Sequence, residues 1–371
     1  MMINRVLVGE AYIGLTDLCI SRRTLWGAEK KGTTMDNSIF YDIRKDCKSD
    51  MPFKIIIGPR GCGKTYSVLD YMQEVSSEDS KFIYMRRDGT EIDSCASEYG
   101  NPFKALNSDK GYNIAPFQIS KFNGFGIGDD TTCECIGYGV ALSTFASMRS
   151  QDFSDVDRIF FEEFIPEKHK RKIKGEGQAL LNVYETINRN RELKGEKPVE
   201  LIMCANGIDL ANPILLELGA TSIIAKMLAN KQRRITIPEK QLYIEIIPRN
   251  KVSDLKEETA LYKLANKDFI VDALETTFRG ADLQFVRKGV NLRSYKTEFS
   301  YGNYVVFSNK EHYYIAESKV PCKIAIPERE LQRFKAVFAP RYRILRGMGN
   351  IYFDDYVTLT LFDTYLDYEV I

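Results

Sequence analysis

From residue 53 onward, short apolar runs alternate along the chain with segments of helical or irregular pattern. Near-continuous apolar runs are typical of parallel strands that are covered on both faces. The clearest helices are expected over Lys64–Val75 and Gly177–Leu193, where apolar residues recur at helical spacing. The pattern therefore predicts an α/β domain built on a parallel sheet. Its expected strands are Phe53–Ile57, Lys81–Arg86, Arg158–Phe161 and Val199–Ala205.

After about residue 234 the pattern changes to short strands rich in Tyr, Phe, Val and Ile, separated by turn sequences around Gly302 and Asn309. These strands are expected over Leu242–Ile247, Tyr304–Phe307 and His312–Ala316. They predict a smaller, β-rich α+β domain. We thus expect an extension of unknown structure over residues 1–34, a first domain over 35–233 and a second over 234–371, with the boundary between Ala229 and Pro238.

Composition excludes several classes of protein. The formal net charge is +1, so a nucleic-acid partner would have to meet a local basic patch. Eight cysteines without repeating spacings and without an apolar leader favour reduced thiols in a cytoplasmic protein. Two histidines in the whole chain argue against a zinc site. The longest apolar runs have the length of a strand, so no membrane anchor is expected.

The sequence GPRGCGKT matches the phosphate-binding Walker A pattern at each fixed position. A predicted strand enters this loop and a predicted helix leaves it, so backbone N–H groups and the helix N-terminus would face anionic phosphates. Lys64 is expected to reach the β- and γ-phosphates of ATP, and the Thr65 hydroxyl to coordinate Mg²⁺. The nucleotide-binding residues are predicted to be Gly58, Pro59, Arg60, Gly61, Cys62, Gly63, Lys64 and Thr65.

Polar residues end two further strands of the predicted sheet. In RIFFEEF, Glu162 is the candidate Mg²⁺ ligand and Glu163 the candidate general base that polarises the attacking water. Asn206 follows the next apolar strand, where its side chain could sense the γ-phosphate or hold that water. Plain solvent-facing acids at Glu162 and Glu163, and a simple turn residue at Asn206, remain the alternatives.

Two groups of basic residues are candidates for contacts with other molecules. Arg189 and Arg191, near the end of a predicted helix, could complete the site of a neighbouring subunit as an arginine finger, or could be ordinary surface residues. The densest basic run follows the acidic pair and could contact a phosphate backbone or form a solvated surface. Its candidate DNA-binding residues are Lys168, Lys170, Arg171 and Lys172.

Together, GPRGCGKT, FIYMRR, RIFFEEFIPEK, LLNVYETINRNRE and the strand ending in Asn206 resemble the short genome-packaging ATPases of phi-29-type tailed phages. The resemblance covers residues 35–213 well and the β-rich remainder weakly. MDNSIFYDIRK at Met35 looks like the N-terminus of that family. One residue departs from the pattern, because Glu162 stands where the family commonly has Asp.

The resemblance implies a terminase-like molecular motor of viral genome packaging, with an ASCE-type P-loop domain. It implies a homo-oligomeric ring, pentameric in the family, that docks on the portal or connector of a procapsid in the host cytoplasm and drives double-stranded DNA inward. A packaging RNA is left open as a further partner. Arg189 looks like the family's trans-acting finger, and Lys168 falls in what resembles its DNA-facing loop.

The second domain of related large terminases is an RNase H-like nuclease with clustered carboxylates. Here the strands after Leu283 carry only isolated acids such as Glu298, Glu311 and Glu317, so we expect a nuclease-like fold without nuclease activity. The leading hypothesis is ATP hydrolysis coupled to translocation of double-stranded DNA. A cellular or plasmid P-loop ATPase of the helicase or AAA+ type, and a nucleotide-gated DNA-binding scaffold, are the alternatives.

Overall fold

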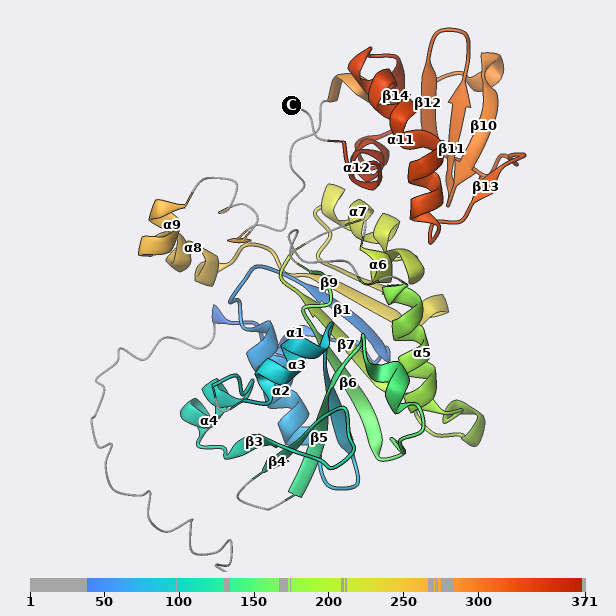
Figure 1. Cartoon of the computed structure of the whole chain (residues 1–371). Helices are drawn as coiled ribbons and strands as arrows, with labels where there is room; N and C mark the ends of the chain where they lie inside the picture. The colour runs from blue at the N-terminus through green and yellow to red at the C-terminus, as the bar shows by residue number, and fades with distance from the viewer. Residues whose placement is uncertain are drawn as a thin grey trace, which may run out of the picture. The chain divides into compact units, whose positions relative to one another are not determined.

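Figure 1 shows a computed structural model of the chain. It describes residues 39–97, 99–129, 134–166, 173, 175–207, 210, 212–265, 270, 273–274 and 283–368. The predicted extension over residues 1–34 lies outside these residues. The described part contains two sheets, one of nine strands and one of five.

The larger sheet has the order β3-β4-β5-β2-β6-β7-β1-β9-β8. The six central strands, β5, β2, β6, β7, β1 and β9, run parallel to one another. The edge strands β3, β4 and β8 pair antiparallel with their neighbours. A mostly parallel sheet places the carboxyl ends of its central strands along one edge. The strands are β1 (Phe53–Ile57), β2 (Lys81–Arg86), β3 (Ile114–Phe117), β4 (Gly124–Asp129), β5 (Glu134–Ala141), β6 (Val156–Glu162), β7 (Glu200–Ala205), β8 (Arg234–Ile237) and β9 (Leu242–Ile246).

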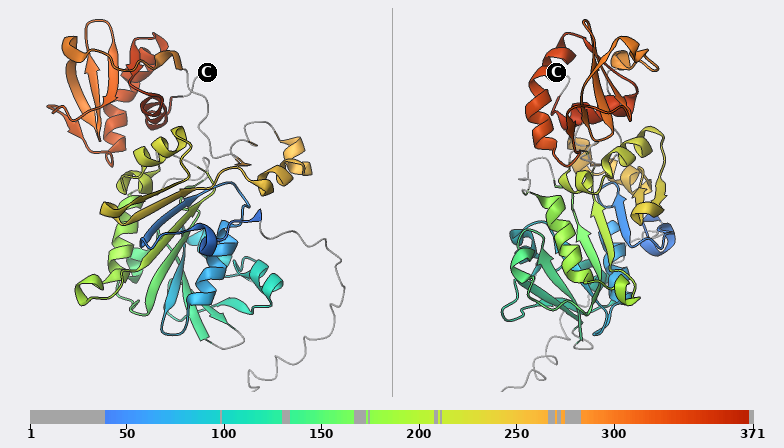
Figure 2. Two further views of the ribbon diagram at one scale, coloured as in Figure 1. Left: turned by 180° about the vertical axis from the view of Figure 1, so that it is seen from behind. Right: turned by 90° about the vertical axis from the view of Figure 1, so that its right-hand side faces the viewer.

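Helices cover both faces of this sheet, as Figure 2 shows. Because side chains alternate along a strand, Ile56 and Phe160 belong to one core cluster and Ile55 and Phe161 to another. The first cluster includes residues of α2 (Lys64–Val75), α3 (Gly89–Cys95) and α4 (Lys104–Lys110), and α1 (Ile43–Asp46) joins it. The second includes residues of α5 (Glu176–Asn188), α6 (Pro213–Glu217) and α7 (Thr221–Ala229).

The smaller sheet has the order β13-β10-β11-β12-β14, with an antiparallel meander β10-β11-β12 at its centre. Aromatic side chains fill its core, and the rings of Tyr301 and Phe334 stack 4.0 Å apart. This arrangement confirms the predicted β-rich α+β character. Its elements are β10 (Lys296–Tyr301), β11 (Tyr304–Ser308), β12 (Tyr313–Glu317), β13 (Ala325–Ile326), α11 (Leu331–Gly347), β14 (Ile351–Phe353) and α12 (Tyr356–Tyr365).

Short helices connect these elements. Between the sheets along the chain lie α8 (Lys251–Glu257) and α9 (Ala260–Leu264). No helix among the described residues combines the length and the apolar character that a membrane crossing requires. The 3₁₀ helices are Phe145–Met148, Glu192–Lys194, Pro238–Lys240, Leu283–Phe285 and Leu292–Ser294.

The structure corrects two expectations. The strand Leu242–Ile246 was expected to belong to the second domain, but it pairs in parallel with β1, so the first sheet continues past residue 233. The mostly apolar run LYIEI does not reveal which strand it pairs with, because its partner β1 lies nearly two hundred residues earlier in the chain. The helix expected over Gly177–Leu193 ends at Asn188, because Arg189 takes a left-handed conformation with φ of 40°.

Candidate active site

The predicted phosphate loop lies between the end of β1 and the start of α2. Gly61 and Gly63 take φ values of 71° and 99°, which an L side chain rarely adopts. The Gly58 N–H donates to the Ala205 carbonyl at 3.2 Å and so ties the start of the loop to the neighbouring strand β7. The structure thus has the strand, turn and helix that the sequence predicts. The N-terminus of the helix α2 lies at the end of the loop, where a bound phosphate is expected.

Lys64 is the first residue of α2, and only 4% of it is exposed. Its ammonium donates to the carbonyl oxygens of Gly58 at 3.0 Å and Pro59 at 2.8 Å, so it is folded under the loop. It also donates to the Cys62 Sγ at 3.5 Å, and because none of these three partners is a carboxylate, the ammonium can still attract an anion bound in the loop. This placement suits the predicted phosphate-binding role.

The acidic pair and Asn206 meet the loop at the carboxyl edge of the sheet. Ile57 pairs with Ala205, and Glu162 pairs with Cys204. The three strands β1, β7 and β6 therefore end at nearly the same level of the sheet. Since β7 lies between the other two, β6 is two strand spacings, about 10 Å, from β1. That separation leaves room for a phosphate chain and a metal ion between loop and acids.

Arg86, at the end of β2, joins the two acids. Its guanidinium donates to Glu162 Oε2 at 3.0 Å, to Glu163 Oε2 at 2.7 Å and to Glu91 Oε2 at 3.2 Å. Burial alone would lower the pKa of Arg86, but Tyr84 and these carboxylates raise it above its usual value. The guanidinium is therefore a fixed positive charge that orients both acids.

Glu162 has the chemistry of a Mg²⁺ ligand but is already engaged. It also accepts a hydrogen bond from the Tyr84 hydroxyl, and both Tyr84 and Arg86 contact its Oε2. Burial and the neighbouring carboxylate raise the pKa of Tyr84 well above its usual value, so this hydroxyl remains a donor. Oε1 of Glu162 and the Thr65 hydroxyl are hard oxygen donors that fit Mg²⁺ or its bound water.

Glu163 is held from two sides. Asn206 Nδ2 donates to Oε1 at 2.8 Å while Arg86 holds Oε2, and 42% of the Glu163 side chain is exposed. Its backbone φ of 50° is uncommon for a residue other than glycine. A carboxylate with fixed orientation and open access to solvent is suited to polarise a water molecule. Asn206, predicted to touch phosphate or water, thus orients Glu163 in this structure.

The other end of α5 carries Arg189. Its guanidinium donates to the carbonyls of Thr186 at 3.2 Å and Gln151 at 3.0 Å and pairs with Asp152 at 3.4 Å, and 46% of its side chain is exposed. Arg191 instead donates to the carbonyls of Ser154 and Val156. Both arginines therefore lie at the amino end of β6.

This position separates Arg189 from the phosphate loop of its own chain. Strand β6 has seven residues, so its amino end lies roughly 20 Å from its carboxyl end. That distance exceeds the reach of an arginine side chain. Arg189 can complete a nucleotide site only on another molecule.

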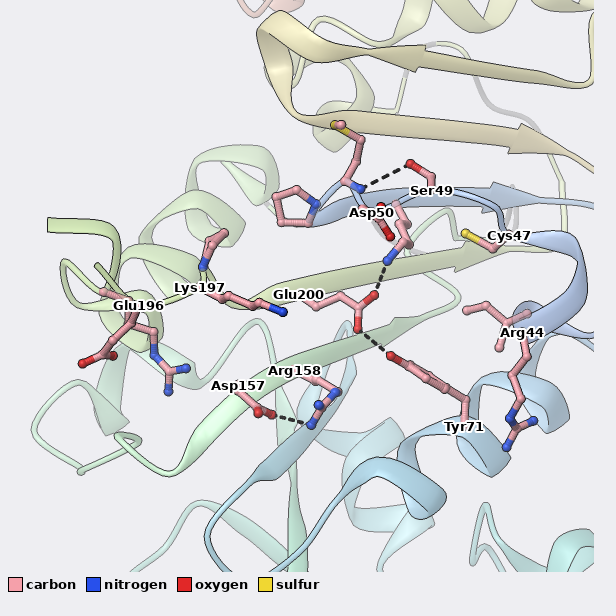
Figure 3. A pocket seen from close by; sticks show the side chains of 16 residues that line it. Arg44, Cys47, Ser49, Asp50, Tyr71, Asp157, Arg158, Glu196, Lys197 and Glu200 are labelled. Carbon is pink, nitrogen blue, oxygen red and sulfur yellow. Dashed lines mark hydrogen bonds and ion pairs between the residues drawn. The ribbon is translucent and has the colours of Figure 1, made fainter. Parts of the chain in front are cut away.

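A surface pocket of about 930 Å³ occupies the same amino edge (Figure 3). Lys54 at the start of β1 pairs there with Glu200, which also accepts a hydrogen bond from Tyr71 at 3.3 Å. Arg158 pairs with Asp157 at 2.7 Å. These charges neutralise one another, and the pocket faces away from the phosphate loop, so we do not assign the nucleotide to it.

Several predicted contacts lie outside the described residues. These are the DNA-binding candidates Lys168, Lys170, Arg171 and Lys172. In the second domain, Glu298 accepts from Ser308. The described residues contain no group of three or more His, Cys, Asp or Glu side chains placed to hold a metal ion.

Sequence reasoning missed Arg86 and Tyr84 as members of the site. Their only signal was the position of FIYMRR at the end of a predicted strand, since nothing local shows that β2 lies next to β6. The next residue, Arg87, forms a buried bidentate ion pair with Glu176 at 2.6 and 3.1 Å, which ties β2 to the start of α5. The end of β2 thus contacts the acidic pair through Tyr84 and Arg86 and is itself anchored to α5 through Arg87.

The fold and this edge define the class: an α/β protein with a largely parallel sheet, at whose carboxyl edge a glycine-rich loop of Walker A sequence joins a strand to a helix. The sequence profile of the podovirus DNA encapsidation protein (Gp16) family matches residues 35–324. The chain belongs to this family, as its motifs indicated.

Individual proteins with similar sequences are DNA packaging proteins of Bacillus phages. The DNA packaging protein of Bacillus phage phi29 is 29% identical over 184 residues, which make up 49% of this chain and 51% of the relative. That of Bacillus phage B103 is 27% identical over 228 residues, 60% of this chain and 66% of the relative. The chain thus spans about half the length of the phi29 protein in this match.

Two solved structures share the fold across nearly their whole length. The Phi-28 gp11 DNA packaging motor has a TM-score of 0.54 at 20% identity, over 90% of this chain and 99% of that one. The bacteriophage Phi-29 viral genome packaging motor assembly has a TM-score of 0.55 at 20% identity, over 88% and 99%. At this level of identity, the likeness establishes the fold alone.

Proposed function

We propose that the protein is an ATPase that drives double-stranded DNA into a viral procapsid. The observation that carries this proposal is the Glu163 carboxylate, held between Arg86 and Asn206 at the end of β6, two strands from the strand that enters the predicted phosphate loop. Membership of a DNA encapsidation family supports the coupling to DNA. The order β6-β7-β1, with one strand between the acidic strand and the loop strand, supports an ASCE-type P-loop domain.

In this proposal each residue has one task. Lys64 and the loop N–H groups bind the phosphates of ATP, and Glu163 accepts the proton of the attacking water. Thr65 and Glu162 hold Mg²⁺, which when bound neutralises charge on the phosphate oxygens. Arg86 and Asn206 hold Glu163 in one orientation, in which it can accept that proton.

Arg189 acts on the neighbouring subunit. Its position at the amino edge and its half-exposed side chain support a trans-acting finger, a role worth roughly 10³ to 10⁵ in rate. Such a site requires an oligomer, and we propose a homo-oligomeric ring, a pentamer as in the family, in the host cytoplasm and transiently on the portal of the procapsid. The loop around Lys168 would contact the DNA backbone, and a packaging RNA is a further candidate partner. We keep the RNase H-like interpretation of the second domain, without nuclease activity, as a proposal.

The test is steady-state ATP hydrolysis by wild type and Lys64→Ala, with and without long double-stranded DNA, across a salt series. We expect hydrolysis that DNA stimulates, stimulation that falls as salt rises because phosphate contacts are screened, and no activity in the variant. Hydrolysis that ignores DNA in the presence of the procapsid would contradict the packaging function. Strand separation by the protein would favour a helicase instead.

A further inference from the structure

The backbone of Arg60 in the phosphate loop is bonded on both sides by residues that follow the first sheet. Its carbonyl oxygen accepts a hydrogen bond at 2.8 Å from the ammonium of Lys256, 196 residues later in the chain. Its N–H donates to the carbonyl oxygen of Ala273 at 3.0 Å. A loop residue with both peptide groups engaged cannot rotate unless Lys256 and Ala273 move with it.

Lys256 lies directly against the loop because the fold fixes its helix. Helix α8 is capped by Asn250, whose side chain accepts from the Ser253 N–H at 3.1 Å, and its Val252 side chain is buried. A Cβ added to Gly61 would lie 2.1 Å from the Lys256 ammonium, so a side chain there would displace the ammonium from this position. The contact therefore depends on a glycine of the motif itself.

The charges around Lys256 favour an anion in the loop. Burial lowers the pKa of Lys256, the nearby cations Lys64 and Arg60 lower it further, and Cys62 has the opposite effect. In the part of the chain that the structure describes, the ion pairs of α8 join Arg249 to Asp254 and Glu257, and none includes Lys256. Three cations thus surround the loop where phosphates would bind.

The peptide between Arg60 and Gly61 links these observations. In a planar trans peptide the carbonyl and the following N–H point in opposite directions. A hydrogen bond from Lys256 to the Arg60 carbonyl therefore fixes the direction of the Gly61 N–H, and it also strengthens that N–H as a donor. N–H groups of such loops are the ones that bind phosphate.

We propose that Lys256 is a positioning residue for phosphate binding, which holds the Gly61 N–H toward the nucleotide and couples the loop to α8. This inference rests on the proposed nucleotide site. Binding of a nucleotide should therefore change the mobility of α8, and a change in α8 should alter nucleotide affinity. The segment after the first sheet is in this way a part of the nucleotide site.

The experiment measures ATPγS affinity by calorimetry and hydrogen exchange of α8, with and without ATPγS, in the full-length protein. Lys256→Met keeps the apolar stem and removes the donor, Lys256→Arg restores a charged donor, and Lys251→Met changes an exposed lysine of the same helix. We expect Lys256→Met to weaken binding about tenfold or more and to abolish the exchange response, since a hydrogen bond to a charged group is lost. Lys256→Arg should recover most of the affinity, and Lys251→Met should match wild type.

Several outcomes would contradict the proposed role of Lys256. Wild-type affinity together with a wild-type exchange response in Lys256→Met would overturn the positioning role. Equal loss in Lys256→Met and Lys256→Arg, with unchanged thermal stability, would also overturn it. If Lys256→Met does not fold, the wild-type exchange of α8 decides, because an α8 that ignores ATPγS contradicts the coupling. A wild type that binds no ATPγS would overturn the proposed function itself.

Discussion

The two edges of the large sheet differ in how their charged side chains are arranged. At the carboxyl edge, Lys64 donates to two carbonyl oxygens and the Cys62 sulfur, and Glu163 is held by two donors with part of its surface open. At the amino edge, the pocket charges Lys54 and Glu200 neutralise each other. Arg189 lies at that edge too, with 46% of its side chain exposed and a carboxylate partner, Asp152, at 3.4 Å.

If the proposed function holds, one chain carries two parts of a site that cannot meet within it. The carboxyl edge would bind the nucleotide and polarise water, and Arg189 of the same chain is too far away to reach it. A neighbouring copy would bring Arg189 to that place. The following substitutions test this division, from the largest expected effect to the smallest.

Lys64→Ala should abolish ATP binding and hydrolysis, because it removes the cation beneath the loop. The matched control is Lys197→Ala, an exposed lysine that lines the amino-edge pocket and should leave both unchanged. Binding of a fluorescent ATP analogue and phosphate release measure the two effects. Equal behaviour of the two variants would remove the distinction between the edges.

Arg189→Ala should reduce hydrolysis by the assembled protein roughly 10³-fold or more while nucleotide affinity stays within a few-fold of wild type. Arg191→Ala is the control, because Arg191 lies at the same edge but is less exposed than Arg189. Phosphate release in the presence of procapsids and DNA is the measurement. A larger loss in Arg191→Ala would reassign the finger to that residue.

Glu163→Gln should reduce hydrolysis about 10²- to 10⁴-fold with ATP binding retained, because it removes a general base and keeps the side-chain shape. Single-turnover phosphate release separates this effect from binding. Full activity in the variant would show that another group polarises the water.

Arg86→Lys should cause a smaller loss, about tenfold in hydrolysis rate, because an ammonium cannot contact Glu91, Glu162 and Glu163 in the fixed geometry of a guanidinium. Arg158→Lys at the amino edge is its control and should keep the wild-type rate. A rate for Arg86→Lys equal to wild type would mean that Asn206 alone orients Glu163.

Local chemistry made the phosphate loop predictable. The glycines, Lys64 and the flanking strand and helix are adjacent in sequence, and the helix Lys64–Val75 was predicted with its observed bounds. The order of strands was not predictable, and so the contact of Arg86 with both acids was missed. The interactions of Arg60 with Lys256 and Ala273 were missed for the same reason.

Strands β4 and β5 were also missed, because their glycines interrupt the apolar pattern, and β3 was missed because it is short and contains Pro116. The structure shows why these glycines are needed. A Cβ on Gly126 would lie 2.3 Å from the ring of Phe117, and one on Gly139 would lie 2.2 Å from the ring of Phe125. The aromatic side chains of neighbouring strands thus fill the space that side chains at these positions would occupy.

The most direct test of a site shared between copies is a mixing experiment with Glu163→Gln and Arg189→Ala. Each variant alone should be nearly inactive in the assembled state. A mixture should regain hydrolysis well above the sum of the two, because some interfaces join an intact Glu163 on one copy to an intact Arg189 on the next. A mixture that assembles and stays as inactive as its components would contradict the account.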